Sequence, residues 1–324
     1  MTRLQLSIGL GDYDLNRPLI DGLVQPQGIE LIPTVASSPE RHWRMLLHDA
    51  FDVCEMSMGS FVALRSRESD RFIGLPVFPH RRFRHSFVFV TGQRPIRSAA
   101  ELKGGRIGVR SWQTTAGIYM RGFLADDYGL PVSEVEWVAQ DGDDVELELP
   151  NGIRLSRVPD GETVTDLCAR GELDGLLYPE IPDDVHERTG RIVRLFEDPR
   201  AEEEAHFRRT GIFPIMHLVV VRRELIERHP WIAGNLVQAF DAAKAVAMQR
   251  LRDPRTVSLA WLRWLIEQER ELLGADPWVN GVEPNRHVLE AFLRYSFEQG
   301  VAARPLEVEE LFHESVIEPA PGYV

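Results

Sequence analysis

Hydrophobic and polar positions alternate at the start of the chain. Leu4, Leu6, Ile8 and Leu10 occupy every second position, which predicts a β-strand with one buried face. Similar short strands are then separated by segments with a helical spacing of apolar residues. The predicted strands cover residues 28–32, 52–56, 72–77 and 88–90, and the predicted helices cover 18–24, 39–50 and 61–67. Strands that alternate with helices predict a wound, mostly parallel sheet.

The same alternation starts again near residue 94. A short helix at 98–105, a strand at 106–109 and a helix from about 112 to 128 are expected, followed by a helix at 163–170 and a strand at 172–178. The acidic segment 141–159 contains a Pro-Asn-Gly turn and is interpreted as a hairpin-like insertion. A buried strand at 218–221 and three helices, at about 230–251, 258–273 and 284–299, complete the chain.

A basic cluster lies between the predicted strands at 72–77 and 88–90. His80, Arg81, Arg82, Arg84 and His85 fall within six positions. One interpretation is a solvated basic turn. The other is an anion site at a sheet edge, because the planar guanidinium group matches a carboxylate bidentately. On a strand Arg82 points away from its neighbours and is expected to face solvent.

Composition favours a protein that binds a small anion at a defined place. The chain has 324 residues and a formal net charge of −13, so general affinity for nucleic acid or an anionic membrane is not expected. Lys103 and Lys244 are the only lysines, which disfavours Schiff-base chemistry.

The cysteines and the N-terminus bear on cellular location. Cys54 and Cys168 lack metal or redox spacing, which favours a reduced compartment. No leader pattern precedes the first strand, and no apolar run approaches the ~20 residues of a membrane span. A cytoplasmic location without membrane association is therefore expected.

Common catalytic motifs are missing from the sequence. It contains no phosphate-binding P-loop, dinucleotide fingerprint, serine-hydrolase elbow or H-E-x-x-H zinc motif. No cofactor and no metal are expected, although a metal site assembled from distant His, Asp and Glu residues stays open.

Nearly the whole chain resembles the 4,5-dihydroxyphthalate decarboxylase family. The resemblance rests on GDYD at 11–14, DVCEMS at 52–57, PVFP at 76–79, FRHS at 83–86, TGIFPIMH at 210–217, HPW at 229–231, NR at 285–286, YSFEQG at 295–300 and EELF at 309–312, with Gly281. It implies an α/β, two-lobed type II periplasmic-binding-protein-like fold. Residues 1–92 and 210–324 would form lobe 1, with the C-terminal helices on it, and residues 93–209 would form lobe 2.

Two places depart from the family pattern. Arg110 and Ser111 stand where the family usually has Pro-Glu, although Trp112, Gln113 and Thr115 fit. Asn280 stands where a tyrosine is usual. If either position contacts the substrate, substrates other than 4,5-dihydroxyphthalate stay open.

The resemblance implies a cofactor-independent decarboxylase acting on a hydroxylated aromatic carboxylate. In this interpretation Arg81 and Arg84 bind carboxylates, and the helix start at Thr114 and Thr115 forms a second clamp. His217, or else His85, is the general acid. Further candidates to bind the substrate or accept its hydroxyl proton are Asp12, Tyr13, Glu55, Ser57, Ser86, Trp112 and Gln113.

Structural roles are the alternative for these residues. Arg84 could pair with Asp52 or Glu55, the two histidines could be core residues, Asp12 could be a helix cap, and Tyr13 and Trp112 could be packing residues. The alternative function is a non-catalytic solute-binding protein for an organic anion. Apolar surface on the C-terminal helices would be compatible with a homo-oligomer.

Overall fold

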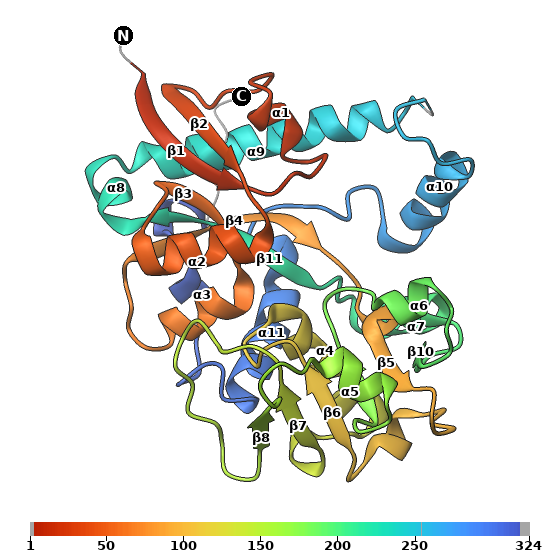
Figure 1. The fold of residues 1–324 in the computed structure, drawn as a ribbon. Helices are drawn as coiled ribbons and strands as arrows, with labels where there is room; N and C mark the ends of the chain where they lie inside the picture. The colour runs from red at the N-terminus through yellow and green to blue at the C-terminus, as the bar shows by residue number, and fades with distance from the viewer. Residues whose placement is uncertain (1–2, 254, 318–324) are drawn as a thin grey trace.

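Two β-sheets form the centres of two lobes (Figure 1). The computed structural model describes residues 3–253 and 255–317. The first sheet has the order β2-β1-β3-β11-β4, and the second has the order β10-β5-β9-β6-β7-β8. The first sheet contains β1 (Leu4–Leu10), β2 (Ile29–Val35), β3 (Val53–Ser57), β4 (Phe72–Arg81) and β11 (Ile215–Arg222). The second contains β5 (Val88–Thr91), β6 (Arg106–Val109), β7 (Glu136–Ala139), β8 (Arg154–Arg157), β9 (Gly175–Leu177) and β10 (Ile192–Arg194).

Each sheet is mixed and contains one reversed strand. β11 is antiparallel to β3 and β4, and β5 is antiparallel to β9 and β10. The other pairs are parallel. The reversed strands β5 and β11 each follow a crossing of the chain between the lobes. The first crossing is at residues 82–87, and the second comes after β10. The sheets confirm the predicted α/β class.

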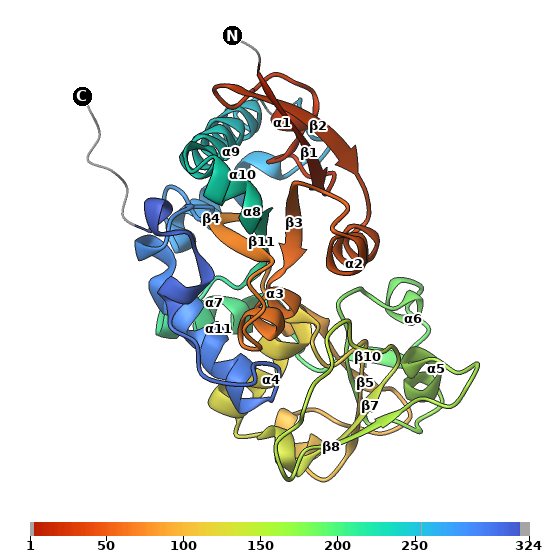
Figure 2. The same cartoon turned by 90° about the vertical axis from the view of Figure 1, so that its left-hand side faces the viewer.

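Helices flank both sheets. Those before β11 are α1 (Arg17–Ile20), α2 (Ser38–His48), α3 (Met58–Arg65), α4 (Thr115–Tyr128), α5 (Val164–Ala169), α6 (Asp183–His186) and α7 (Pro199–Thr210). Those after it are α8 (Arg223–Arg228), α9 (Trp231–Arg250), α10 (Leu262–Leu273) and α11 (Arg286–Glu298). α9 packs on β4 and α1, as expected for lobe 1, whereas α11 contacts both α3 and α4 and so joins the lobes (Figure 2). No helix of the described residues is long and apolar enough to cross a membrane.

Two apolar clusters hold these layers together. One lies between the first sheet and α9 and includes Ile8, Val219 and Leu236. The other runs from the first lobe into the second and includes Met56 and Phe292. Burial of this continuous cluster stabilises the contact between the lobes on the side away from their opening.

The acidic segment differs from its prediction. Residues 141–159 do not form a hairpin, because β8 pairs with β7 in parallel. For β8 to run in the same direction as β7, the intervening chain must return to the amino ends of the strands. On the way it passes the start of α4, where Asp143 and Asp144 lie. β5, at residues 88–91, pairs with strands of the second sheet, so the chain has already left the first sheet before residue 92. The lobe boundaries at 92/93 and 209/210 stay a prediction.

Candidate functional site

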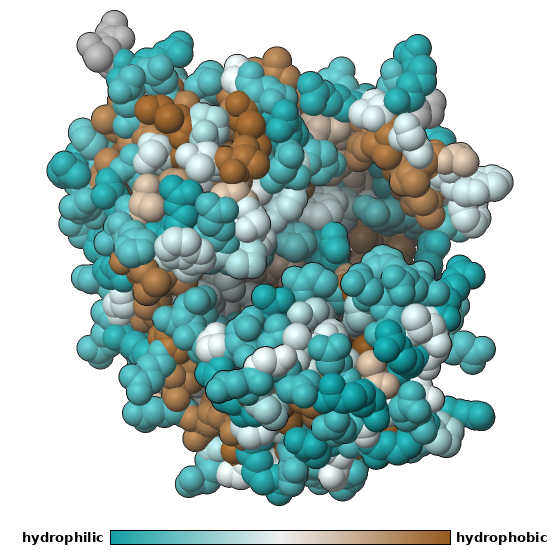
Figure 3. Space-filling model, in the orientation of Figure 1, coloured by the Kyte–Doolittle hydropathy of each residue, from teal (hydrophilic) through white to brown (hydrophobic). Residues whose placement is uncertain are grey.

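A cleft of about 350 Å³ lies between the lobes. Figure 3 shows the surface hollowed between them, with mostly hydrophilic residues around the opening. The first lobe contributes Ser57, His80 and His217, and the second contributes residues that follow β6 and β7, among them Thr114 and Asp144. The cleft thus lies beyond the carboxyl ends of parallel strands, where ligands bind in open α/β sheets.

His217 lies at the cleft with a fixed ring orientation. Its Nδ1 is 2.6 Å from Glu55 Oε1, and the same oxygen accepts a hydrogen bond from Arg41 Nη2 at 2.7 Å. Because a carboxylate only accepts hydrogen bonds, we assign the ring proton to Nδ1. The Nε2 lone pair of His217 is then left for a ligand, since none of the described residues bonds to that atom.

Glu55 is completely buried and has a partner for each oxygen. Its Oε2 accepts hydrogen bonds from the Gly11 backbone N–H at 2.9 Å and from Asn16 Nδ2 at 3.2 Å. Arg41, on the buried face of α2, also donates to the backbone oxygens of Ala36 and Glu55. Glu55 therefore does not reach the cleft, and it contacts a ligand only through His217.

The rings of His42 and His80 lie beside the ring of His217, so that three histidine rings form a group. The His217 ring centroid lies 4.9 Å from that of His42 and 4.7 Å from that of His80. Burial, reinforced by Arg41, lowers the pKa of His217 well below its ordinary value, and burial with the nearby His217 does the same for the pKa of His42. The pKa of His80 falls to about 2, again chiefly through burial. All three rings are therefore neutral at pH 7.

Replacing His80 with glutamine is expected to make stability less dependent on pH. Between about pH 6.5 and 2 the unfolded chain binds a proton on His80 that the folded chain does not, so stability falls as the pH falls through this window. His80→Gln should reduce the slope of unfolding free energy against pH by about 1.4 kcal/mol per pH unit. Urea unfolding at several pH values measures this slope. An unchanged slope, or an equal reduction in His48→Gln at an exposed position of α2, would contradict it.

The second lobe approaches the first at the start of α4. Thr115 Oγ1 accepts a hydrogen bond from the Gly59 backbone N–H at 2.9 Å and lies 2.9 Å from Ser57 Oγ. Gly59 permits this approach, because a Cβ there would lie 2.2 Å from the Gln113 carbonyl oxygen. Gln113 donates to the side chains of Ser60 and Asp144. Thr114, whose hydroxyl is 2.7 Å from that of Ser111, leaves the helix start open to the cleft.

Arg84 lines the cleft without a carboxylate partner. Its Nη1 donates to the Pro179 carbonyl oxygen at 3.0 Å, and its Nη2 lies 3.1 Å from Met216 Sδ. The alternative pairing with Asp52 or Glu55 is wrong, because those acids bind Arg222 and Arg41. Burial lowers the pKa of Arg84 to about 9, which still leaves the guanidinium charged at pH 7. A buried cation without an ion-pair partner in the described chain favours binding of an anion.

One of the two departures from the family pattern lies in the cleft. Arg110 lines it, paired with Asp141 and donating to Tyr178 Oη at 3.0 Å. Asn280 does not line the cleft, and its Oδ1 instead accepts a hydrogen bond from the Phe78 backbone N–H.

Several predicted residues lie outside the cleft with other partners. Arg81 donates to Asn285 Oδ1 at 2.6 Å and to the Val279 carbonyl oxygen at 2.8 Å, joining β4 to the C-terminal segment. The Asp12 carboxylate is exposed and pairs with Arg17.

Two predicted aromatic residues also have partners within the protein. Trp112 is buried, donates to the Gln299 carbonyl oxygen and packs against the Arg121 guanidinium 3.8 Å from its ring, so it cannot stack on a ligand. Tyr13 lies behind the histidines, where its hydroxyl accepts from Arg41 at 3.3 Å.

The end of the basic cluster turns away from the cleft. His85 is buried against Phe123, and Ser86 donates to Glu203 beside a separate surface hollow. Arg82 is exposed, as predicted.

Sequence reasoning missed Arg41, His42, His80 as a cleft residue, and Asp144. The one available signal was an arginine next to a histidine, Arg41-His42, on a helix that follows a strand.

Two of the solved structures that resemble this chain are solute-binding proteins. The alkanesulfonate-binding protein SsuA from Xanthomonas axonopodis pv. citri, bound to MOPS, has a TM-score of 0.58 and 13% identity, covering 97% of this chain and 99% of its own. The aliphatic sulphonate binding protein SsuA from Escherichia coli has a TM-score of 0.55 and 11% identity over the same shares. These neighbours confirm the two-lobed periplasmic-binding-protein-like fold.

Sequence relatives are more similar. No family model matches the chain. A 4,5-dihydroxyphthalate decarboxylase from Comamonas testosteroni is 39% identical over 326 residues, covering 98% of this chain and 99% of the relative. One from Pseudomonas putida is 35% identical over 214 residues, covering 64% of this chain and 83% of the relative. The chain therefore belongs to the 4,5-dihydroxyphthalate decarboxylase family.

Proposed function

We propose that this protein is a carboxy-lyase that removes CO2 from a hydroxylated aromatic carboxylate, with 4,5-dihydroxyphthalate as the first candidate substrate. Full-length similarity to a curated decarboxylase supports the reaction class. The observation that carries the assignment to this cleft is the 2.6 Å contact between His217 Nδ1 and the buried Glu55 carboxylate, which leaves His217 Nε2 for the substrate.

The substrate carboxylates bind at cationic groups on both sides of the cleft. Arg84 offers a guanidinium that has no ion-pair partner among the described residues, and the start of α4 at Thr114 offers backbone N–H groups and the positive end of the helix dipole. Arg110 adds a second guanidinium near the same rim. One anchor on the crossing between the lobes and one on the second lobe suit an aromatic ring that carries two carboxylates, because together they fix the orientation of the ring.

His217 supplies the proton. Its ring is neutral in the free protein, and the charge of a bound dicarboxylate raises its pKa, so that protonation accompanies binding. The imidazolium gives its Nε2 proton to the ring carbon that bears the leaving carboxylate, and an electron pair of the ring forms the new C–H bond. The lone pair of the hydroxyl oxygen para to that carbon stabilises the positive charge left on the ring. The bond to the carboxylate then breaks, its electron pair restores the aromatic ring, and CO2 leaves. Glu55 acts as a positioning residue, because it holds the Nδ1 proton of His217.

The reaction is tested by measuring CO2 release from 4,5-dihydroxyphthalate and from a panel of other hydroxylated benzoates, with and without a chelator. We expect release from a member with a hydroxyl ortho or para to a carboxylate, and none from the corresponding acid that lacks that hydroxyl. Thermal stabilisation by these acids without any CO2 release would instead support the second candidate, a receptor for an organic anion. The solute-binding proteins of the same fold favour that candidate.

Replacing Arg84 with methionine is expected to weaken substrate binding. Loss of a charge-assisted hydrogen bond costs about 1.5–3 kcal/mol, which corresponds to roughly a 10- to 150-fold increase in Kd. Isothermal titration with the substrate, or with a non-reactive phthalate, measures the change. Arg82→Met, at the exposed neighbouring position, is the matched control. Equal affinities of the two variants would show that Arg84 does not bind the carboxylate.

A further inference from the structure

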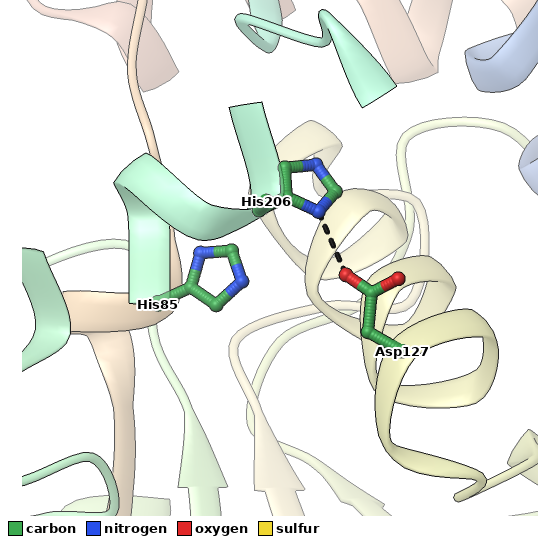
Figure 4. A group of neighbouring side chains, drawn as sticks. All are labelled: His85, Asp127 and His206. Carbon is green, nitrogen blue, oxygen red and sulfur yellow. Dashed lines mark hydrogen bonds and ion pairs between the residues drawn. The ribbon is translucent and has the colours of Figure 1, made fainter. Parts of the chain in front are cut away.

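A second group of ionisable side chains lies outside the cleft. His85 in the short 3-10 helix η1 (His85–Phe87), Asp127 near the end of α4 and His206 on α7 approach one another (Figure 4). His206 Nδ1 lies 2.7 Å from Asp127 Oδ2. One nitrogen or oxygen atom from each of the three residues lies within 4.8 Å of the other two. The residues are far apart in sequence, so no local spacing reveals the group.

His85 is the unusual member of this group. Its side chain is 1% exposed, and both ring nitrogens are buried without a hydrogen-bond partner in the part of the chain that the structure describes. The ring stacks on Phe123, with centroids 3.9 Å apart and planes 13° apart, which fixes its orientation. Burying a polar ring without a partner is unfavourable, so a ligand for at least one nitrogen is expected.

We propose that His85, Asp127 and His206 bind a divalent transition-metal ion of the zinc class, with water as a fourth ligand. Two imidazoles and one carboxylate are ligands that Zn²⁺ prefers. Zn–N and Zn–O distances near ~2.0–2.2 Å require the three ligand atoms to move closer together than in the ion-free group. Small side-chain rotations of Asp127 and His206, whose hydrogen bond to each other the ion would replace, can provide this movement.

The charges around the group are compatible with an ion. Because neither ring nitrogen of His85 has a hydrogen-bond partner in the described chain, one of them is free to donate its lone pair to the ion. Arg209 pairs with Asp127 Oδ2 at 2.5 Å, but its side chain is 53% exposed and can move into solvent when the ion takes its place. The net charge of the three ligands with Zn²⁺ is then +1.

The location suggests what the ion does. η1 belongs to the first crossing between the lobes, α7 leads into the second crossing, and α4 belongs to the second lobe. An ion bound there would tie both crossings to that lobe. It would also fix the backbone next to Arg84, which lines the cleft. The site therefore has a structural role, and binding of the ion does not require the proposed decarboxylation to occur.

Metal binding to the full chain tests this site. Protein freed of metal by a chelator is titrated with Zn²⁺ by calorimetry and with Co²⁺ by visible absorption. We expect one ion per chain, the strong ligand-field bands of a four-coordinate Co²⁺ site, and an increase in Tm with Zn²⁺ concentration. His206→Gln and Asp127→Asn should each weaken Zn²⁺ binding by more than the roughly 10- to 100-fold effect of outer-shell partners. His48→Gln should bind as the wild type does.

The outcomes that overturn the site are distinct. The metal-free protein could bind no ion, or both His206→Gln and Asp127→Asn could still bind it as the wild type does. Loss of binding in His80→Gln would place the ion in the cleft instead. Asp127→Asn preserves the shape of the side chain and guards against loss of binding through unfolding, which circular dichroism monitors. None of these measurements depends on CO2 release, so the metal site and the proposed reaction can fail separately.

Discussion

Replacing His217 with glutamine is expected to lower kcat for decarboxylation by about 10²- to 10⁴-fold, the usual contribution of a general acid. Glutamine keeps a hydrogen-bonding group near Glu55 but cannot give up a proton at the position of Nε2. Binding of the substrate should change much less than kcat, because the carboxylates are held by Arg84 and the start of α4. Rates of CO2 release at saturating substrate, together with Kd from calorimetry, separate the two effects.

The contrast between kcat and binding decides the role of His217. A glutamine variant that loses affinity but keeps at least a tenth of kcat would show that His217 binds the substrate and that another group gives the proton. His80→Gln is the matched variant, since His80 is a neighbouring neutral histidine in the same cleft but has no carboxylate partner. We expect a smaller loss of kcat in His80→Gln than in His217→Gln.

The sequence predicted the fold well because local patterns determine strands and helices. Alternation at Leu4, Leu6 and Ile8 gave the first strand, and helical spacing gave α9. The hairpin at 141–159 was wrong because a turn signal at Pro150 to Gly152 does not report whether the next strand pairs in parallel or antiparallel orientation. Orientation depends on where the chain has returned to, which is not a local property.

The candidate site was harder to predict because its contacts are distant in sequence. Glu55 and His217 are separated by 162 positions, and only the pairing of β3 with β11 brings them together. Within the basic cluster Arg82 is exposed and Arg84 lines the cleft, as predicted, whereas Arg81 and His85 lie outside the cleft. Arg81, Arg84 and His85 are all buried, yet they face the C-terminal segment, the cleft and the inside of the second lobe, respectively. Residue type alone does not distinguish these three surroundings.

Replacing Glu55 with alanine is expected to lower the free energy of unfolding by about 3–5 kcal/mol, because removal of one partner leaves a buried charge unpaired. Arg41 is 1% exposed, and the 2.7 Å contact with Glu55 is its ion pair. The substitution also leaves the Gly11 backbone N–H and Asn16 Nδ2 without their acceptor. Urea unfolding of the two proteins measures the difference.

An exposed ion pair on α2, the helix that carries Arg41, supplies the control for Glu55→Ala. Glu40 pairs with Arg44 on the outer face of α2 at 3.2 Å, and both side chains are at least 35% exposed. Since solvent screens such a pair, Glu40→Ala should cost about 1 kcal/mol or less. The double variant Arg41→Met/Glu55→Leu, which removes both buried charges, should be more stable than Glu55→Ala. If Glu55→Ala were no more destabilising than Glu40→Ala, the buried pair would not stabilise the first lobe, and its contribution would be confined to holding His217 for catalysis.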